Sequence, residues 1–324
     1  MSSVGRRPVR DGIDAAFTES PIPTPWRTFD RQSWAALRAD VPLLLSQADI
    51  DELRGLNVPL DLDEVETVYL PLVRLLDLWS QGLARMHETT SRFLGEDGAR
   101  LPFVIGLAGS VAVGKSTLAR VICSLLARIG DARRVSLVTT DGFLWPNAEL
   151  EARGLMDRKG FPESYDRSGL LRFVRELKSG ARRVEHPVYS HDHYDVLRGE
   201  RRLVEEPDIV VVEGLNVLQS GSGAFVSDFF DFTIYLDAAL VDLRRWYVER
   251  FRKLRDTAFR DPDHYFHRFA SYTDEEADDY AIDVWKRINE RNLIENIAPT
   301  RERATLILRK GPNHGVDQIR MRRL

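Results

Sequence analysis

The stretch GLAGSVAVGKSTLARV, Gly106 to Val121, decides how the whole sequence is interpreted. From Gly109 it has a glycine, four residues and then Gly-Lys-Ser, ending at Ser116, which is the spacing of a loop that wraps its backbone around a phosphate. The apolar run FVIGLAG predicts a strand before the loop, and KSTLARVICSLLARI predicts an amphipathic helix after it. This context indicates a nucleotide-binding loop rather than an incidental glycine-rich turn.

The chemistry of such a loop predicts which residues hold the nucleotide. Backbone N–H groups and the positive end of the following helix attract phosphate oxygens, and glycine lets the phosphate come close. We expect Lys115 to reach the β- and γ-phosphates of a nucleoside triphosphate, and the Ser116 hydroxyl to bind Mg²⁺. The residues expected to form the nucleotide site are Gly109, Ser110, Val111, Ala112, Val113, Gly114, Lys115, Ser116 and Thr117.

Short apolar runs and helical patterns alternate through the rest of the chain. The runs, rich in Val, Ile, Leu and Thr, cover residues 103–109, 134–142, 208–214, 231–237 and 304–311. The helical patterns cover residues 115–129, 168–179, 238–255 and 274–293. Alternation of this kind predicts right-handed βαβ units. We therefore predict an α/β fold with a doubly wound, mainly parallel sheet flanked by helices.

The N-terminal part has a different pattern and sets the domain boundaries. Residues 1–28 contain the proline-rich stretch SPIPTPW and predict an extended or disordered tail. Residues 29–100 predict a helical appendage, and residues 101–324 the nucleotide- and substrate-binding core. Residues 29–324 are thus expected to form a single domain.

Three local signals place helices within this appendage. Ser46 followed by Asp49 predicts the N-terminal cap of a short helix. Pro71 predicts a kink in a longer helix, and Gly95 predicts its end.

Composition narrows the class of protein. The 324 residues include 46 Lys and Arg against 50 Asp and Glu, and the resulting net charge of −4 gives no overall attraction to nucleic acid or anionic membranes. The single cysteine, Cys123, has no partner for an intrachain disulfide, and no run approaches the roughly 18 apolar residues of a membrane span. We expect a cytoplasmic protein without nucleic-acid or membrane partners, in which Cys123 is a structural thiol.

Charged residues beyond two predicted strands are candidates for catalysis, because ligands of a parallel sheet lie at the carboxyl ends of its strands. Asp141 in LVTTDGF is the candidate base for an attacking hydroxyl, and Glu213 in IVVVEG the candidate carboxylate for Mg²⁺ or its water. A structural strand-end cap explains either residue alone equally well. Arg250 interrupts a mostly apolar helical face, and either pairs with a structural carboxylate or reaches the transferred phosphoryl group.

The segment VYSHDHYD, residues 188–195, brings two histidines close together. As a strand it would place His191 and His193 on one face with Tyr189 and Asp195. No further His or Cys cluster supplies a closed set of metal ligands, so substrate contact is favoured over a metal site.

Motifs beyond the loop carry a resemblance to a known family. The segments AGSVAVGKSTLARV, TTDGF, KGFPESYD, PVYSH, EGLNVLQ, DPDHYFH and PTRERA together resemble the bacterial type I pantothenate kinases, from about Phe29 to the C-terminus. The resemblance implies a homodimer of P-loop kinase fold. It also implies ATP-dependent phosphorylation of pantothenate to 4′-phosphopantothenate, the first step of coenzyme A biosynthesis, with feedback inhibition by coenzyme A or its thioesters.

The resemblance also implies roles for individual residues. Lys115 and Ser116 would hold phosphate and Mg²⁺, Asp141 would be the base, Glu213 would support the metal, and Arg250 would stabilise the phosphoryl group. The residues implied to bind pantothenate are Asp141, Tyr189, His191, Tyr247, Arg250, Asn289, Tyr265 and Phe266. Those implied to bind the inhibitor are Arg120, His191 and Phe251, and those implied to bind adenine are Asn57 and His314.

Three alternatives stay open on the sequence. Another P-loop small-molecule kinase, acting on uridine or ribulose phosphate, has a similar architecture, and only the family likeness of PVYSH and KGFPESYD argues against it. A regulatory GTPase would need a guanine-reading segment of the NKxD kind after a late strand, and no such segment is found. A non-catalytic nucleotide sensor would leave Asp141 without a use beside a complete loop.

Overall fold

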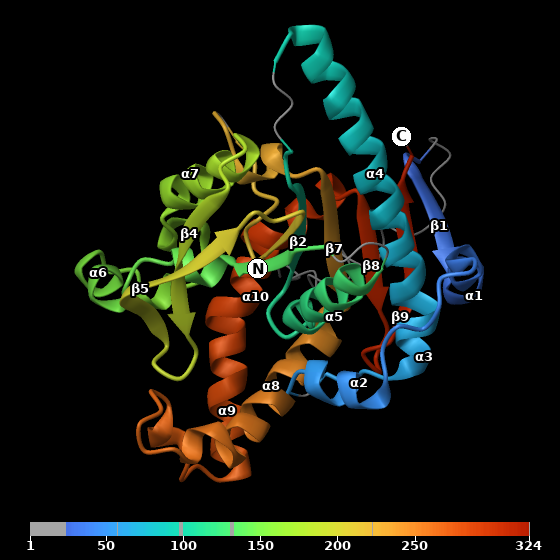
Figure 1. Cartoon of the computed structure of the whole chain (residues 1–324). Helices are drawn as coiled ribbons and strands as arrows, with labels where there is room; N and C mark the ends of the chain where they lie inside the picture. The colour runs from blue at the N-terminus through green and yellow to red at the C-terminus, as the bar shows by residue number, and fades with distance from the viewer. Residues whose placement is uncertain (1–23, 57, 97–99, 130–132, 222, 324) are drawn as a thin grey trace, which may run out of the picture.

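A seven-stranded sheet runs through the protein (Figure 1). The computed structural model describes residues 24–56, 58–96, 100–129, 133–221 and 223–323. Along the sheet the strand order is β1-β9-β8-β7-β2-β6-β3. The strands are β1 (Trp26–Asp30), β2 (Phe103–Gly109), β3 (Val135–Thr139), β6 (Ile209–Glu213), β7 (Phe232–Ala238), β8 (Leu306–Lys310) and β9 (Val316–Arg322).

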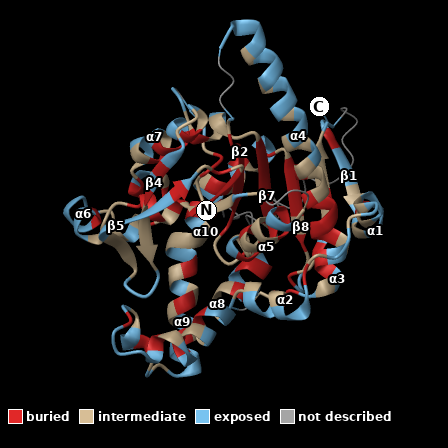
Figure 2. Ribbon diagram, in the orientation of Figure 1, coloured by how far each residue is buried: buried red, intermediate tan, exposed pale blue. Residues whose placement is uncertain are grey.

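The five strands from β8 to β3 are parallel, which confirms the predicted fold class. All residues of β2 and β6 are buried, because helices cover both faces of the sheet and each strand is a continuous apolar run. Figure 2 shows these buried strands enclosed by helices whose outer sides are exposed. The longer helices are α4 (Leu70–Leu94), α5 (Lys115–Arg128), α7 (Arg167–Lys178), α8 (Leu240–Asp256) and α9 (Asp274–Val284).

The position of β2 explains where ligands bind. Within the sheet, the chain leaves β2 through α5 and continues to β3 on one side of β2. Strands β7 and β8 lie on the other side of β2. The loop after β2 therefore lies where the direction of strand addition reverses. In open α/β sheets this is the position of the ligand crevice.

The helical segment before β2 follows most of its local signals. The predicted cap of α2 (Gln47–Leu53) is confirmed: the Asp49 amide donates to Ser46 Oγ at 3.3 Å, and Asp49 Oδ2 accepts from the Ser46 amide at 2.8 Å. Gly95 ends α4 with φ 70°, as predicted. The kink expected at Pro71 stays a prediction: this proline is the second residue of α4, which continues the helical run from Leu62 without a break. A π-helical turn, Val65–Tyr69, precedes it.

Strand β1 corrects the boundary of the predicted tail. Trp26 to Thr28, expected within the tail 1–28, pair antiparallel with β9. Trp26 is 4% exposed, its ring lies 4.7 and 4.8 Å from the guanidinium groups of Arg320 and Arg322, and its indole donates to Glu302 at 2.8 Å. One aromatic side chain thus anchors a strand that the nearby prolines obscure in the sequence. Residues 1–23 lie outside the described residues, and the tail there stays a prediction.

A second, two-stranded sheet was not predicted. It joins β4 (Arg183–Ser190) to β5 (Asp195–Glu205) in an antiparallel hairpin. Its residues are mostly exposed or half-buried, so it lacks the apolar runs that mark the central strands. The strand interpretation of VYSHDHYD is wrong at its centre, because residues 191–194 form the turn and Tyr194 adopts φ 51°.

The C-terminal helical pattern is interrupted by two π-helical turns. After α9 come a π-helical turn at Trp285–Asn289, the short α10 (Glu290–Asn292) and a second π-helical turn at Leu293–Ile297. Helices α8 and α9 enclose a small separate core of Phe251, Phe259, Phe269, Ala277 and Ala281.

Two further properties follow from the described helices. None of them combines the length and the apolar character that crossing a membrane requires. Cys123 lies half-buried in α5, and burial raises the pKa of its thiol to about 12, as expected for a structural cysteine.

Candidate active site

The phosphate-binding loop joins β2 to α5 with three residues at positive φ. These are Gly109 at 149°, Ala112 at 64° and Gly114 at 98°. A Cβ on Gly109 would lie 2.6 Å from the carbonyl oxygen of Leu236, so only glycine fits there. Lys115 curls back over the loop, and its Nζ donates to the Ser110 carbonyl at 2.8 Å. Positive φ values expose successive N–H groups on one side of a loop, which is the arrangement that binds anions.

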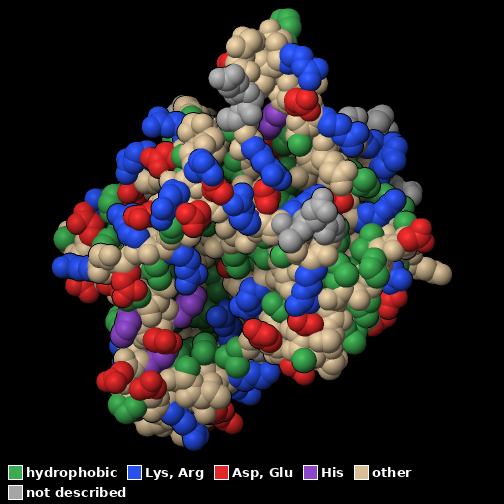
Figure 3. All heavy atoms as spheres, viewed as in Figure 1, with side chains coloured by type: hydrophobic (Ala, Val, Ile, Leu, Met, Phe, Trp, Pro, Cys, Tyr) green, Lys and Arg blue, Asp and Glu red, His purple; other side chains and the backbone are tan. Residues whose placement is uncertain are grey.

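Four charged side chains act on one another at the mouth of this loop. Burial lowers the pKa of Lys115, while the carboxylates of Glu213 and Asp141 raise it and Arg250 lowers it further. The two acidic strand-end residues and the α8 arginine therefore lie near enough to the loop lysine for their charges to act on it. Figure 3 shows basic and histidine side chains gathered around a hollow in front of α10 and beside α5.

Ser116 and Glu213 are the residues whose oxygen atoms could hold a metal. Ser116 Oγ donates to Glu213 Oε2 at 3.2 Å, and the side chain of Glu213 is almost fully buried. Burial raises the pKa of Glu213, while Lys115 and Ser116 lower it. A hydroxyl beside a carboxylate matches the hard oxygen ligands that Mg²⁺ prefers. Within the described ranges, no group of three or more His, Cys, Asp or Glu forms a closed metal site. Mg²⁺ would therefore take its other ligands from phosphate and water.

Asp141 lies on a 3₁₀ turn, Thr140–Phe143, directly after β3. Its amide donates to Thr139 Oγ1 at 3.4 Å. The next residue, Gly142, packs against β4 so closely that a Cβ would lie 2.3 Å from the carbonyl oxygen of Pro187. This contact holds Asp141 beside the strand that carries Tyr189.

Aromatic side chains form the wall next to Asp141. The rings of Tyr189 and His191 meet edge to face at 5.2 Å, and the ring of Tyr194 lies 5.2 Å from Tyr265 and 4.8 Å from Phe266. Burial raises the pKa of Tyr189 and lowers that of His191, and the Asp141 charge acts on both groups. The structure thus brings together four of the residues implied to bind substrate, although His191 lies in a turn rather than a strand.

Helix α8 and the π-helical turn Trp285–Asn289 supply the other wall. The Tyr247 hydroxyl is hydrogen bonded to the Asn289 side chain, and burial raises the pKa of Tyr247 to about 12. Arg250 lies one turn further along α8, where the charges of Asp141 and Glu213 act on it. In the described part of the chain no carboxylate is within ion-pair distance of Arg250. Among the residues that the structure describes, no structural ion pair accounts for this arginine.

The residues implied to bind an inhibitor are already engaged in packing. Phe251 belongs to the small core of α8 and α9, with ring distances of 5.5 Å to Phe259 and 5.6 Å to Phe269. Arg120 on α5 donates twice to the carbonyl of Leu53, at 3.2 and 3.0 Å, and so ties α2 to α5. Both roles stay predictions.

Of the two residues implied to bind adenine, only His314 can be placed, because Asn57 lies outside the described residues. His314 follows β8, has φ 65°, and stacks on Trp246 with ring centroids 3.7 Å apart. Burial lowers the pKa of His314 to about 4, so its ring is neutral near pH 7. A neutral imidazole at the sheet edge offers a flat surface for a base, and this role also stays a prediction.

Lys159 is a site residue that the sequence analysis missed. It is 9% exposed, and its Nζ donates to Asn147 Oδ1 at 2.7 Å and to the Tyr194 carbonyl at 2.5 Å. Its ammonium lies 3.7 Å from the centre of the Tyr194 ring. Burial lowers the pKa of Lys159 to about 8. The motif KGFPESYD, already singled out for its resemblance, contains this lysine and was the available signal.

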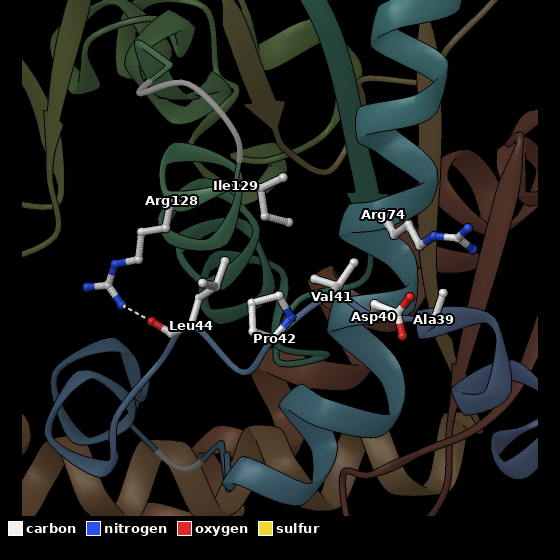
Figure 4. Close-up of a pocket in the computed structure, with 8 residues that line it drawn as sticks. All are labelled: Ala39, Asp40, Val41, Pro42, Leu44, Arg74, Arg128 and Ile129. Atoms are coloured by element: carbon white, nitrogen blue, oxygen red, sulfur yellow. Dashed lines mark hydrogen bonds between the residues drawn. The ribbon is translucent and has the colours of Figure 1, made fainter.

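The open cavity in Figure 4 lies elsewhere, between α4, α5 and the segment after α1 (Arg31–Ala35). It has a volume of about 400 Å³ and includes Arg128, whose Nη1 donates to the Leu44 carbonyl at 3.0 Å. None of the predicted site residues lines it.

Comparisons with known proteins show the family of this chain. A protein from Rhodococcus opacus named pantothenate kinase is 54% identical over 303 residues, which cover 93% of this chain and 98% of that protein. A protein of the same name from Mycobacterium sp. strain KMS is 55% identical over 306 residues, with the same coverage. The chain belongs to the pantothenate kinase family.

Two broader likenesses place the pantothenate kinase family among related kinases. The Phosphoribulokinase / Uridine kinase family matches residues 104–263, from β2 to the segment after α8. A solved structure from Silicibacter sp. TM1040, named for a fructose transport system kinase, is 25% identical and covers 63% of this chain and 85% of its own, with a TM-score of 0.50. Membership of a kinase family excludes the regulatory GTPase and favours an enzyme over a nucleotide sensor.

Proposed function

We propose that this protein transfers the γ-phosphoryl group of ATP to the primary 4′-hydroxyl of pantothenate, which gives 4′-phosphopantothenate and begins coenzyme A biosynthesis. The observation that carries the proposal is the convergence of Lys115, Asp141 and Arg250 at one sheet edge beside an aromatic wall. The near full-length identity to proteins named pantothenate kinase supports the choice of acceptor.

On the donor side, the loop and Lys115 hold the phosphates of ATP. Ser116 and Glu213 are the residues that would hold Mg²⁺. When bound, this ion would neutralise part of the negative charge on the phosphates. Arg250 adds a positive charge opposite Lys115, where negative charge develops on the transferred group.

On the acceptor side, Asp141 takes the proton of the attacking hydroxyl. The hydroxyl oxygen forms a bond to the γ-phosphorus while the bond from that phosphorus to the β–γ bridging oxygen breaks, and ADP leaves. Tyr189, His191 and Lys159 surround Asp141 and orient the substrate. Tyr247 and Asn289 are joined by a hydrogen bond and line the other wall of the pocket.

We further propose that coenzyme A or its thioesters inhibit the enzyme at this site. Tyr265 and Phe266 continue the aromatic wall toward the small core that contains Phe251. The pantetheine arm would lie against these aromatic rings, and Arg120 at the loop side would meet the phosphates.

A homodimer is the proposed assembly. Helix α4 projects from the body of the protein (Figure 1) and carries large exposed apolar side chains at Leu78, Met86 and Phe93. Their spacing puts them on one stripe of the helix. A second copy of α4 would bury this stripe.

We place the enzyme in the cytoplasm, without nucleic-acid or membrane partners. A single cysteine and a net charge of −4 support this placement.

The experiment that tests the function is ADP release by the purified protein. Mg-ATP is supplied with pantothenate, uridine, ribulose 5-phosphate or no acceptor, and each reaction is repeated with coenzyme A. We expect release that depends on pantothenate and decreases with coenzyme A. If ADP release instead depends on uridine or ribulose 5-phosphate, pantothenate is not the acceptor. If added coenzyme A leaves ADP release unchanged, coenzyme A is not an inhibitor.

A further inference from the structure

A buried lysine behind the phosphate-binding loop has no role in the site described above. Lys310, the last residue of β8, is 4% exposed. Its Nζ donates to the carbonyl oxygen of Val113 at 3.4 Å. A Cβ on Gly114 would lie 3.2 Å from the same nitrogen. The ammonium group therefore contacts the Val113 carbonyl and fills the space beside Gly114 that a side chain would need.

Glu64 supplies the opposite charge for this lysine from the N-terminal helical segment. It is 5% exposed, and its carboxylate raises the pKa of Lys310, which burial lowers. Glu64 Oε1 accepts a hydrogen bond from the Val316 amide at 3.1 Å, and the Tyr69 hydroxyl donates to the same carboxylate. Strand β9 and the π-helical turn before α4 thus hold Glu64 in place.

The contact with Val113 fixes the direction of a loop donor. The C=O and N–H of a trans peptide point in opposite directions. Because Lys310 holds the carbonyl of the Val113–Gly114 peptide, the N–H of Gly114 is directed away from the lysine. Gly114 is also the N-cap of α5, where the helix leaves its first N–H groups free for an anion.

We propose that Lys310 is a positioning residue for nucleotide binding, which orients the Val113–Gly114 peptide so that its N–H faces the bound phosphate, with Glu64 holding the lysine in place. The inference rests on the proposed use of ATP at this loop. It gives the N-terminal helical segment a role in nucleotide affinity, through the carboxylate that Glu64 contributes.

The test separates this role from simple stabilisation by a buried pair of charges. The variants are Lys310→Met, Glu64→Gln and their combination, with Lys286→Met as a control at an exposed lysine. Thermal unfolding is measured without nucleotide, ATP affinity by calorimetry, and KM and kcat for both substrates by ADP release. Each single variant leaves one charge buried without its partner, so we expect it to unfold at a lower temperature than the wild type. The combined variant removes both charges, so we expect its unfolding temperature to return toward that of the wild type.

Nucleotide affinity is expected to follow a different pattern. Lys310→Met and the combined variant both lack the donor to Val113, so we expect the Kd and KM for ATP to rise about tenfold, with the KM for pantothenate unchanged. Recovery of ATP affinity in the combined variant together with its stability would show a structural charge pair only and overturn the proposal. Unchanged affinity in Lys310→Met would also overturn it. If the wild type binds ATP but ignores pantothenate, the proposed acceptor fails, while ATP affinity still decides the role of Lys310.

Discussion

The hydroxyl of Ser116 donates a hydrogen bond of 3.2 Å to Oε2 of Glu213, although the two residues are 97 positions apart in the chain. The contact exists because β2 and β6 are neighbours in the sheet, with Leu107 paired to Glu213. The first turn of α5 and the end of β6 therefore meet at the phosphate-binding loop. Two oxygen donors for a cation result from strand pairing rather than from a local motif.

Replacing Glu213 tests the proposed metal position. Glu213→Gln keeps the shape of the side chain but removes its charge, so we expect the Mg²⁺ concentration for half-maximal activity to rise roughly tenfold or more. A Mg²⁺ titration of ADP release measures the effect, with Glu275→Gln on exposed α9 as the control. An unchanged titration would remove Glu213 from the metal site.

Asp141→Asn tests the catalytic base. The amide cannot accept the hydroxyl proton, so we expect kcat to decrease by roughly 10² to 10⁴. Binding of ATP should be largely retained, because the loop and Lys115 are unaltered. Calorimetry with ATP and steady-state kinetics separate the two effects, and Asp279→Asn at an exposed position is the control. Near-normal turnover would show that another group takes the proton.

The pKa of Lys159 predicts how activity depends on pH. Burial lowers it to about 8, so the ammonium group loses its proton as the pH rises through that value. If this charge holds an anionic group of substrate or product, kcat/KM for pantothenate decreases above about pH 8. Lys159→Met should be less active and should lack this alkaline decrease. An identical pH profile in the variant would assign the decrease to another group.

The same lysine predicts a pH dependence of stability. Its pKa is below the ordinary value of 10.5, so the unfolded chain binds more protons between about pH 8 and pH 10.5. The cost of burying its charge is present below pH 8 and is relieved as the pH rises through this window. The unfolding temperature of the wild type should therefore rise relative to that of Lys159→Met between pH 8 and pH 10.

Gly142→Ala tests whether close packing against β4 positions Asp141. The new Cβ would lie 2.3 Å from the Pro187 carbonyl oxygen, a backbone atom that cannot rotate away. We expect a loss of about 1–3 kcal/mol in the free energy of unfolding, and a lower kcat because the 3₁₀ turn shifts. Gly82→Ala is the matched control, since it enters open space within α4 and should stabilise by roughly 0.5–1 kcal/mol. Normal kcat in Gly142→Ala would separate this packing from catalysis.

Charge introduced on α4 tests the proposed homodimer. Phe93 is 87% exposed and Met86 56% exposed. Glutamate at both positions should convert the dimer to a monomer in light scattering coupled to size-exclusion chromatography. Ser91→Glu lies on the other side of the helix and should leave the assembly unchanged. A monomeric wild type would refute this assembly.

Local signals in the sequence were sufficient for much of the fold. The glycine spacing of the loop, the apolar run before it and the helix after it were all confirmed, because each depends on backbone conformation and burial over a few residues. The same holds for the cap at Ser46 and the helix end at Gly95. The family likeness, carried by motifs such as KGFPESYD and PVYSH, pointed to the acceptor.

The tertiary structure alone decided which distant residues meet. Strand order placed Glu213 beside Ser116, and the packing of β8 and β9 placed Lys310 and Glu64 behind the loop. The hairpin β4–β5 and the edge strand β1 were missed because their exposed, polar residues leave no apolar run. Sequence spacing encodes backbone conformation over a few residues, whereas strand pairing and side-chain packing join positions that no local period relates. The loop could therefore be predicted from the sequence, but its supports could not.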